Sequence, residues 1–135
     1  MTTLTIAGLA REGGVGVETI RYYQRRGLLA EPPRTGGSGL AGGIRRYDDE
    51  AVRRLKFVRS AQAAGFTLEE VGELLKFDAT DDRPRARAMA RGRIAALDQK
   101  IRELEVAKVW LTRLADECSA SDVGRCPILQ AFEAS

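Results

Sequence analysis

Apolar residues along the chain recur mainly at helical spacing, and glycine and proline interrupt the pattern. Within residues 4–29 they predict two short helices, the first capped by Thr5 and the second covering residues 17–26. Gly13 and Gly14 lie between them. Two short helices joined by a glycine-containing turn are typical of a helix-turn-helix motif. Similar helix hairpins occur in folds that bind no nucleic acid, so this motif alone is a weak signal.

Residues 30–47 predict a small β-hairpin, the wing of a winged helix. Pro32 and Pro33 end the preceding helix. Five glycines then form a loop: Gly36, Gly37, Gly39, Gly42 and Gly43. The exit from the loop, residues 44–47, reads Ile-Arg-Arg-Tyr and is β-prone and doubly basic. A disordered linker is the alternative, and we favour the wing because the chain returns at once to structured sequence.

A second pair of helices follows the wing. A helix over residues 50–64 is expected to begin after Asp48 or Asp49, either of which can cap it. Thr67 and Glu70 have the spacing of a capping box, in which each side chain accepts a hydrogen bond from the other residue's backbone N–H. This box predicts that a further helix starts directly after Thr67.

The last predicted helix is long, covering about residues 85–117. A heptad stripe, apolar except at Lys108, follows it in the steps of three and four residues that are typical of a coiled coil, at Ile94, Leu97, Ile101, Leu104, Lys108, Leu111 and Ala115. At 1.5 Å per residue the helix is on the order of 50 Å long, too long to bury the stripe against so small a head. We therefore expect a homodimer, with a helix of an intramolecular bundle as the alternative.

Charge and composition narrow the class of function. Residues 1–60 carry a net charge of +5 and residues 61–135 a net charge of −2, which fits a nucleic-acid-binding head or ordinary solubility charge equally well. The chain has no histidine, which excludes histidine-based catalysis and histidine metal ligands. No apolar run approaches the roughly 20 residues of a membrane-spanning helix, and residues 1–10 lack a secretory signal pattern. We expect a cytoplasmic protein that is not an enzyme.

Basic and aromatic side chains gather at the second helix and the wing. Arg21 and Tyr22 on that helix can donate hydrogen bonds to phosphates or base edges. Arg45 and Arg46 in the wing can grip the flanking DNA backbone. Three further arginines either extend this surface or form a solvated face: Arg53, Arg54 and Arg59.

Two cysteines, Cys118 and Cys126, lie just after the long helix with seven residues between them. Two thiolates without histidine suit a soft ion: Cu(I), Ag(I), Au(I) or Hg(II). The pair can also serve redox sensing or form a disulfide, although an intracellular DNA-binding protein works in a reducing compartment. Inert, small apolar side chains are a further interpretation, and the spacing alone leaves all of these open.

At this level of detail the chain resembles the MerR family of transcription regulators over nearly its full length. The matching stretches are residues 4–6, 17–29, 44–47 and 60–70. The resemblance implies a winged-helix head, an antiparallel coiled-coil dimer and binding to a dyad in a promoter with an overlong spacer. Such regulators bend and untwist this DNA so that RNA polymerase can engage. The family's DNA contacts map onto Thr19, Arg21, Tyr22, Arg45 and the rest of the wing.

The tail resembles the metal-sensing branch of the family, in which one cysteine follows the long helix and a second precedes Pro-Ile or Pro-Leu. Here these are Cys118 and Cys126, the latter followed by Pro127 and Ile128. The head resembles mercury-responsive members, which carry a third cysteine where this chain has Arg83. The two-cysteine pattern resembles instead the copper, silver and gold sensors.

The sequence therefore predicts a mainly α fold with a winged helix-turn-helix head, a small β wing, a helix pair and a long C-terminal antiparallel coiled-coil dimerisation helix. Residues 1–76 are expected to bind DNA, residues 77–117 to link and dimerise, and residues 118–135 to form a metal-binding loop and tail. The predicted function is a homodimeric regulator that distorts double-stranded promoter DNA when a soft ion binds Cys118 and Cys126. A thiol-redox regulator of the same fold and a coiled-coil adaptor or metal-buffering protein are the alternatives.

Overall fold

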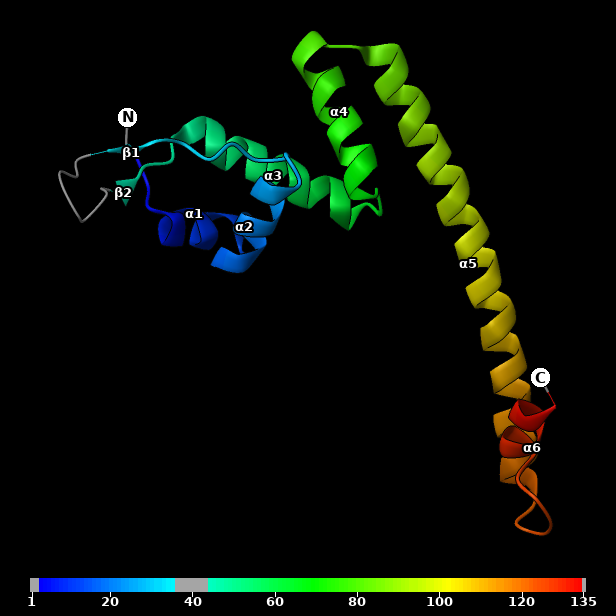
Figure 1. Cartoon of the computed structure of the whole chain (residues 1–135). Coiled ribbons are helices and arrows are strands. Elements are labelled where there is room, and N and C mark those ends of the chain that lie inside the picture. The colour runs from blue at the N-terminus through cyan, green and yellow to red at the C-terminus, as the bar shows by residue number, and fades with distance from the viewer. Residues whose placement is uncertain (1–2, 36–43, 135) are drawn as a thin grey trace. The chain divides into compact units, whose positions relative to one another are not determined.

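The structure, a computed structural model, describes residues 3–35 and 44–134 of the 135-residue chain. In these residues the elements follow the order α1 (Ile6–Gly13), α2 (Val17–Arg25), β1 (Arg34–Thr35), β2 (Ile44–Arg45), α3 (Asp49–Ala63), α4 (Leu68–Thr80), α5 (Arg83–Ala120) and α6 (Pro127–Glu133) (Figure 1). The chain divides into two compact units, Met1–Ala86 and Arg87–Ser135. The mainly α fold class is thus confirmed.

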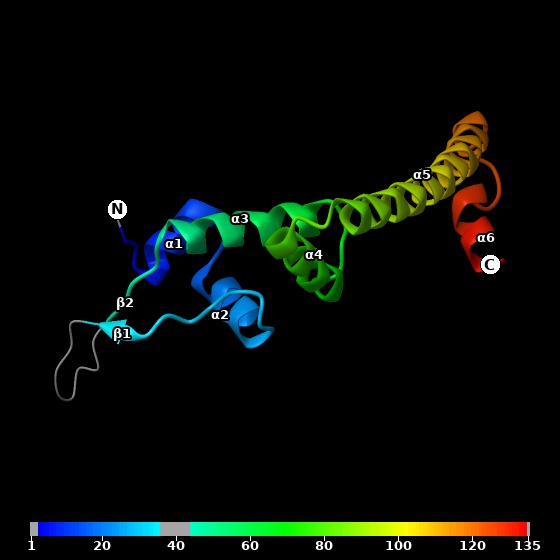
Figure 2. The ribbon, with the colours of Figure 1, turned by 90° about the horizontal axis from the view of Figure 1, so that it is seen from above.

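The first unit, the head, folds around an apolar core of its own. Helix α1 packs against α2 and α3, and α3 packs against α4 (Figure 2). These four helices each contribute to the fully buried side chains, which are Leu9, Ile20, Leu55, Val58 and Val71. Burying a side chain of this size contributes about 1.5–3 kcal/mol, so this core holds the four helices together.

Side-chain caps set the starts of three helices in the head, as the sequence predicts. The Thr5 hydroxyl accepts a hydrogen bond from the backbone N–H of Gly8 at 3.2 Å and begins α1. Asp48, rather than Asp49, caps α3. At α4 both bonds of the capping box are present.

Close packing of α1 on α3 depends on a glycine at the end of α1. A Cβ atom added at Gly13 would lie 2.3 Å from Cδ2 of Leu55, well inside van der Waals contact. The next residue, Gly14, has a φ of +66° and ends the helix, a conformation that glycine adopts without the steric cost of a Cβ. The Gly-Gly break predicted from the sequence therefore both terminates α1 and permits its contact with Leu55.

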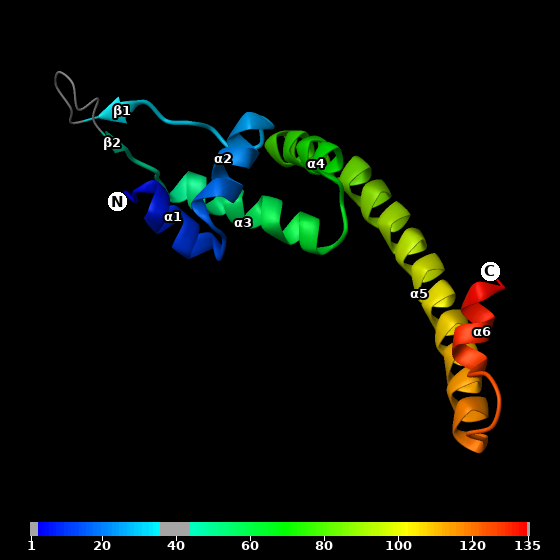
Figure 3. The ribbon, with the colours of Figure 1, turned by 60° about the horizontal axis from the view of Figure 1, so that its bottom comes forward.

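Strands β1 and β2 form the predicted hairpin at the base of the wing. They pair antiparallel, with Arg34 opposite Arg45 and Thr35 opposite Ile44. The glycine-rich tip, residues 36–43, lies outside the described residues. Figure 3 shows β1 following α2 and β2 leading into α3. A backbone bridge between Leu4 and Tyr47, with both hydrogen bonds at 2.8 Å, joins the base of the wing to the start of the chain.

The second unit contains most of α5 and all of α6. Helix α5 has 38 residues and is roughly 57 Å long at 1.5 Å per residue, so it extends beyond the predicted range of 85–117 at both ends. Helix α6 lies alongside the C-terminal end of α5 in all three views (Figures 1–3). Helix α6 lies where a loop and tail were expected, although Pro127 at its first turn is a common helix-start signal.

Candidate nucleic-acid interface and thiol site

Helix α2 carries the predicted recognition residues on the side that its core residues leave exposed. Ile20 and Tyr23 are buried and fix the rotation of the helix. Arg21 and Tyr22 consequently face solvent, whereas Thr19 in the first turn is half-buried. The side chains of Arg21 and Tyr22 are therefore accessible on the surface of the head.

Tyr22 is held by two neighbouring arginines. Arg26 donates a hydrogen bond from Nη1 to the Tyr22 hydroxyl at 3.0 Å. The guanidinium carbons of Arg25 and Arg26 each lie 5.8 Å from the centroid of the Tyr22 ring, within the range of a cation–π interaction. This arrangement keeps the exposed ring in place and concentrates positive charge beside it, as a phosphate-binding surface requires.

In the wing the structure gives Arg45 a partner within the chain. Arg45 Nη2 lies 2.6 Å from a carboxylate oxygen of Glu31. The Nε of Arg45 is buried and has no hydrogen-bond partner among the described residues. Arg46, the next residue, is exposed. The two predicted wing arginines therefore lie at its base in different surroundings, one paired and half-buried and the other facing solvent.

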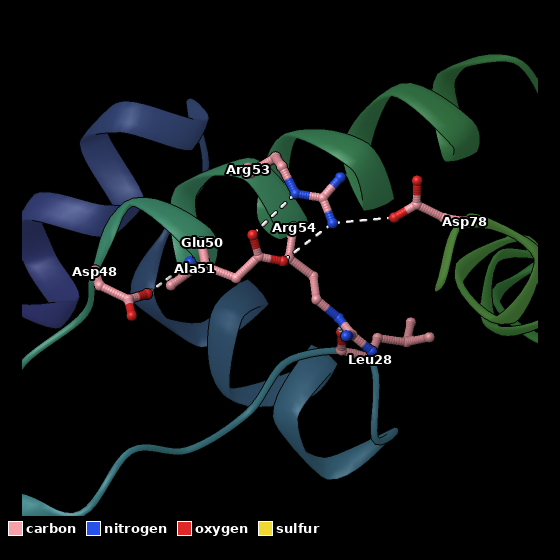
Figure 4. Close-up of polar contacts among 7 residues, drawn as sticks. All are labelled: Leu28, Asp48, Glu50, Ala51, Arg53, Arg54 and Asp78. Carbon is pink, nitrogen blue, oxygen red and sulfur yellow. Dashed lines mark hydrogen bonds and ion pairs between the residues drawn. The ribbon is translucent and has the colours of Figure 1, made fainter. Parts of the chain in front are cut away.

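Arg53 and Arg54 have structural contacts that the sequence analysis did not anticipate (Figure 4). Arg53 binds both oxygens of the Glu50 carboxylate and, from α3, reaches Asp78 on α4, each at 3.0 Å. This contact lowers the pKa of Glu50 and raises that of Arg53. Arg54 donates from Nε to the backbone carbonyl of Leu28 at 2.9 Å. The Glu50–Arg53 spacing was a readable signal of an ion pair, but the contacts with Asp78 and Leu28 are long-range.

The two cysteines come together in the second unit. Cys118 lies in the last turn of α5 and Cys126 immediately precedes α6, and their Sγ atoms are 3.6 Å apart. Both are free thiols and half-buried. A disulfide bond is about 2.05 Å long, so the sulfurs are in contact without being bonded. The folding back of residues 119–125 thus brings two soft donors within reach of each other.

The two thiols have unequal acidity. The backbone amide of Leu129, in the first turn of α6, lowers the pKa of Cys126, and the Cys118 side chain and the amide of Ile128 lower it further. The hydrogen bond with Cys126 raises the pKa of Cys118. Cys126 is therefore the first of the two to become a thiolate as the pH rises.

An aromatic contact and an ion pair hold the thiol site in place. The rings of Trp110 on α5 and Phe132 on α6 lie 5.7 Å apart between centroids, at an angle of 48°. Arg125, beside Cys126, forms an ion pair with Glu133 near the end of α6. None of these residues was among the site residues predicted from the sequence. The spacing of Trp110, Leu114 and Cys118 is a signal, because residues four apart share one face of a helix.

The type and separation of the two sulfur donors fit the binding of one soft ion. Thiolate–metal bonds are about 2.3 Å long for zinc, so two sulfurs at 3.6 Å are near enough to bind the same ion. Among residues 3–35 and 44–134, no group of three or more cysteine, aspartate or glutamate side chains is arranged to hold a metal. Arg83, the position where the resemblance places a third cysteine, is the first residue of α5 and its side chain is 79% exposed. Two sulfurs are thus the donor set that the described residues provide.

A winged helix-turn-helix head with an exposed arginine and tyrosine face, joined to a long helix, defines a DNA-binding regulator. Comparison with known proteins gives its family. A family model described as MerR HTH family regulatory protein matches residues 4–78, and a second, described as MerR, DNA binding, matches residues 52–114. The chain belongs to the MerR family of helix-turn-helix regulatory proteins. Because members of this family are transcription regulators, the prediction that the protein is not an enzyme is confirmed.

Its relatives match along almost their whole length. The mercuric resistance operon regulatory protein of Shigella flexneri is 38% identical over 98% of this chain and 90% of its own. The HTH-type transcriptional regulator CueR of Escherichia coli is 31% identical over 94% of this chain and 92% of its own. Among solved structures, the chain is similar to the transcription regulator PbrR691 from Ralstonia metallidurans CH34 in complex with lead(II). The match has 30% sequence identity and a TM-score of 0.74, and it covers 96% of this chain and 98% of that chain.

Within the described residues, no helix has both the length and the apolar character needed to cross a membrane.

Proposed function

We propose that this protein is a homodimeric transcription regulator that binds promoter DNA and responds to a soft, thiophilic metal ion held by Cys118 and Cys126. The observation that carries the proposal is the 3.6 Å separation of the two sulfurs in a chain that belongs to a DNA-binding regulator family. In this proposal residues 1–76 bind DNA, residues 77–117 dimerise, and residues 118–135 bind the ion. The protein acts in the cytoplasm, where a reducing environment keeps the cysteines as thiols.

DNA binding is assigned to α2 and the wing. Arg21 and Tyr22 are exposed on α2 and supply donors for phosphates and base edges, with Thr19 at the start of the helix. Arg45 and Arg46 lie at the base of the wing and contact the flanking backbone. In the proposed dimer two copies of this surface bind a dyad, and RNA polymerase occupies the same promoter.

Dimerisation is assigned to the exposed stripe of α5. Ile94, Leu97 and Ile101 are 56%, 40% and 51% exposed, and Leu104 and Leu111 continue the same line. Large apolar side chains that recur along one face of a helix, interrupted here only at Lys108, are typical of an interface rather than of a solvated helix face. A second copy of the chain presents the same row, so it can cover the stripe along its length.

The ion is proposed to be bound by thiolates, which are soft ligands and prefer Cu(I), Ag(I), Au(I) or Hg(II). Two relatives support a heavy-metal ion, since one is a mercuric resistance regulatory protein and another was solved in complex with lead(II). A bound ion supplies a positive charge that keeps both sulfurs deprotonated. Joining Cys118 to Cys126 fixes the chain between α5 and α6, and we propose that this change reaches the two recognition helices and alters the twist of the promoter.

The first test is an anaerobic titration of the reduced protein with Cu(I), Hg(II) and Pb(II), each against a competing chelator. The wild-type protein is expected to retain one of these ions per thiol pair, and the Cys118→Ser/Cys126→Ser variant to lose it. The matched control is Ser119→Ala/Ser121→Ala, which changes two residues of the same segment and leaves both thiols. Equal retention of the ion by the double cysteine variant, or loss in the serine control alone, would contradict the proposed site.

The second test separates sensing from DNA binding. In a transcription assay, the Cys118→Ser/Cys126→Ser variant is expected to bind the promoter as well as the wild type does and to show no induction by the ion. If this variant is still induced by the ion, the two cysteines do not sense it. If the wild-type protein does not bind the promoter in the same assay, the proposed function as a transcription regulator is wrong.

A thiol-redox switch is a second candidate, favoured by the same contact between the sulfurs. Two thiols 3.6 Å apart need little movement to reach disulfide geometry. In that reaction each thiol loses its proton, one S–S bond forms, and the two electrons pass to an oxidant such as hydrogen peroxide, which is reduced to two waters. Induction by peroxide in metal-free medium, without any competition-resistant ion binding, would favour this candidate over the metal sensor.

A further inference from the structure

A cleft lies between the recognition helix and the base of the wing. It has a volume of about 260 Å³. Three arginines line it, Arg21 from α2, Arg34 from β1 and Arg45 from β2, and so does one carboxylate, that of Glu31. If α2 and the wing contact one DNA backbone, as the proposed function requires, the width of this cleft determines which phosphates the two parts reach.

The wing cannot determine its own orientation. Its described sheet consists of two residue pairs, Arg34 with Arg45 and Thr35 with Ile44, and an isolated two-stranded hairpin is marginally stable at best. One of these pairs places two arginines directly opposite each other, which is destabilising in a sheet. The ion pair between Arg45 and Glu31 offsets part of this repulsion. The position of the wing relative to α2 must therefore come from contacts at its base.

One side chain on α2, that of Gln24, contacts both segments that form this base. Its Nε2 donates a hydrogen bond to the Tyr47 hydroxyl at 2.9 Å, on the segment that returns from the wing. It donates another to the carbonyl oxygen of Ala30 at 3.3 Å, on the segment that leads into the wing. A side-chain amide nitrogen has two hydrogens, and both are used here. Gln24 thus joins the recognition helix to both segments at once.

Tyr47 is a rigid anchor for this contact. Its side chain is 2% exposed, and its backbone exchanges two hydrogen bonds of 2.8 Å with Leu4. A hydrogen bond to its hydroxyl therefore connects Gln24 to a residue that is itself fixed in the core of the head. Ala30 and Glu31 are adjacent, so the second bond from Gln24 also locates the carboxylate that pairs with Arg45.

We infer that Gln24 is a positioning residue for DNA binding, which sets the wing against the recognition helix so that Arg21 and Arg45 reach the same DNA backbone. Gln24 itself contacts no DNA in this inference. It rests on the proposed function, because the wing needs a fixed position only if both surfaces bind the same duplex.

The test compares Gln24→Met with Gln62→Met. Methionine keeps the length of the side chain and removes its hydrogen bonds. Gln62 is the matched control, because it accepts a hydrogen bond from the Tyr23 hydroxyl and so also joins a glutamine to a tyrosine within the head, away from the wing. The probe is a fluorescein-labelled duplex recovered by selecting a randomised library against the wild-type protein. Binding is measured over a range of salt concentrations, and thermal unfolding is followed for each variant.

Gln24→Met is expected to lower the affinity about tenfold or more and to flatten the slope of log K against log salt by roughly 1–3 units per dimer, because each lost phosphate contact removes about 0.9. In an ethylation interference experiment with Gln24→Met, ethylation of the outer phosphates should no longer interfere with binding, whereas ethylation of phosphates near the centre of the site should still do so. Gln62→Met should lower the melting temperature about as much as Gln24→Met does, because each variant loses hydrogen bonds within the head. It should leave the slope of log K against log salt unchanged. Tyr47→Phe should reproduce part of the loss of affinity. The double variant Gln24→Met/Tyr47→Phe should lose less affinity than the sum of the two single losses, expressed as free energies.

An unchanged slope and interference pattern in Gln24→Met would overturn the inference, as would the same flattening in Gln62→Met. A wild-type protein that enriches no duplex in the selection would overturn the proposed function together with the inference. The two failures are distinguishable, since the first appears only in the variants and the second already in the wild type.

Discussion

The head and helix α5 use apolar residues in opposite ways. In the head most of the described large apolar side chains point inward, and five of them are fully buried. Along α5 the described large apolar residues are mostly exposed, and Leu114 is the buried one. The head therefore contains the partners of its own core, whereas among the described residues the apolar side chains of the α5 stripe stay exposed. This difference teaches that the head forms its core within one chain, whereas the long helix leaves the surface that the proposed dimer would cover.

The largest expected effect is on the stripe. Leu104 is 58% exposed and belongs to it. Leu104→Lys should raise the dissociation constant of the dimer about 1000-fold, equivalent to roughly 4 kcal/mol, because two copies would each bring a charge into an apolar seam. Sedimentation at several concentrations measures the change.

Val106→Lys is the control for this experiment, since Val106 is 71% exposed on the same helix but lies off the stripe. It should leave the dissociation constant unchanged. If both variants dissociate alike, or neither does, the stripe is not the interface.

The next effect is on the core of the head. Leu55→Ala should lower the free energy of unfolding by about 2–5 kcal/mol, because it removes a fully buried side chain and leaves a cavity. Urea unfolding followed by circular dichroism measures this loss. The fluorescence of Trp110, the single tryptophan of the chain, reports on the second unit and should shift much less. Equal shifts of both signals would show that the two units unfold together, contrary to the comparison.

Two glycines extend the comparison to smaller effects of opposite sign. Gly13→Ala should destabilise the protein by about 1–3 kcal/mol, because the added methyl group would meet Leu55. Gly92→Ala should stabilise it by about 0.5–1 kcal/mol, because Gly92 lies within α5 and a Cβ there meets nothing within 4 Å. Thermal unfolding of the two variants measures both changes, and the same sign for both would contradict the difference in packing.

The smallest effect concerns the two thiols. In reduced, metal-free protein Cys126 should be alkylated faster than Cys118, because its pKa is lowered and that of Cys118 raised. Raising the pH should therefore activate Cys126 first and Cys118 later. Mass spectrometry of iodoacetamide-labelled peptides over a pH series measures the two rates.

Cys118→Ala sharpens this test by removing the side-chain hydrogen bond of Cys118, one of the contacts that lower the pKa of Cys126. The alkylation of Cys126 should then require a higher pH. Equal rates at all pH values in the wild-type protein would show that the start of α6 does not favour the thiolate.

Local features of the structure were readable from the sequence. The caps at Thr5 and Thr67 depend on residues within one turn of the helix, so their spacing predicts them. The same holds for the Gly-Gly break after α1 and for the heptad stripe, which is a periodic feature of one helix. The resemblance to a regulator family added the promoter as the expected DNA target, and it favoured metal sensing among the alternatives that the spacing of the cysteine pair left open.

The contacts that the sequence analysis missed join residues far apart in the chain. Arg53 reaches Asp78, Arg54 reaches the carbonyl of Leu28, and Gln24 reaches Tyr47. No spacing rule relates such residues, because their separation depends on how the helices pack.

By itself the sequence determined where the helices of the head begin, that the long helix carries an unburied stripe, and that two thiols follow it. These properties depend on neighbours in the chain. Only the tertiary structure decided that Cys118 and Cys126 meet at 3.6 Å, that α6 packs back on α5 through Phe132 and Trp110, and that Glu31 takes Arg45 as its partner. Each of these contacts depends on the direction in which the chain returns after a turn, and this direction is set by the packing of whole elements.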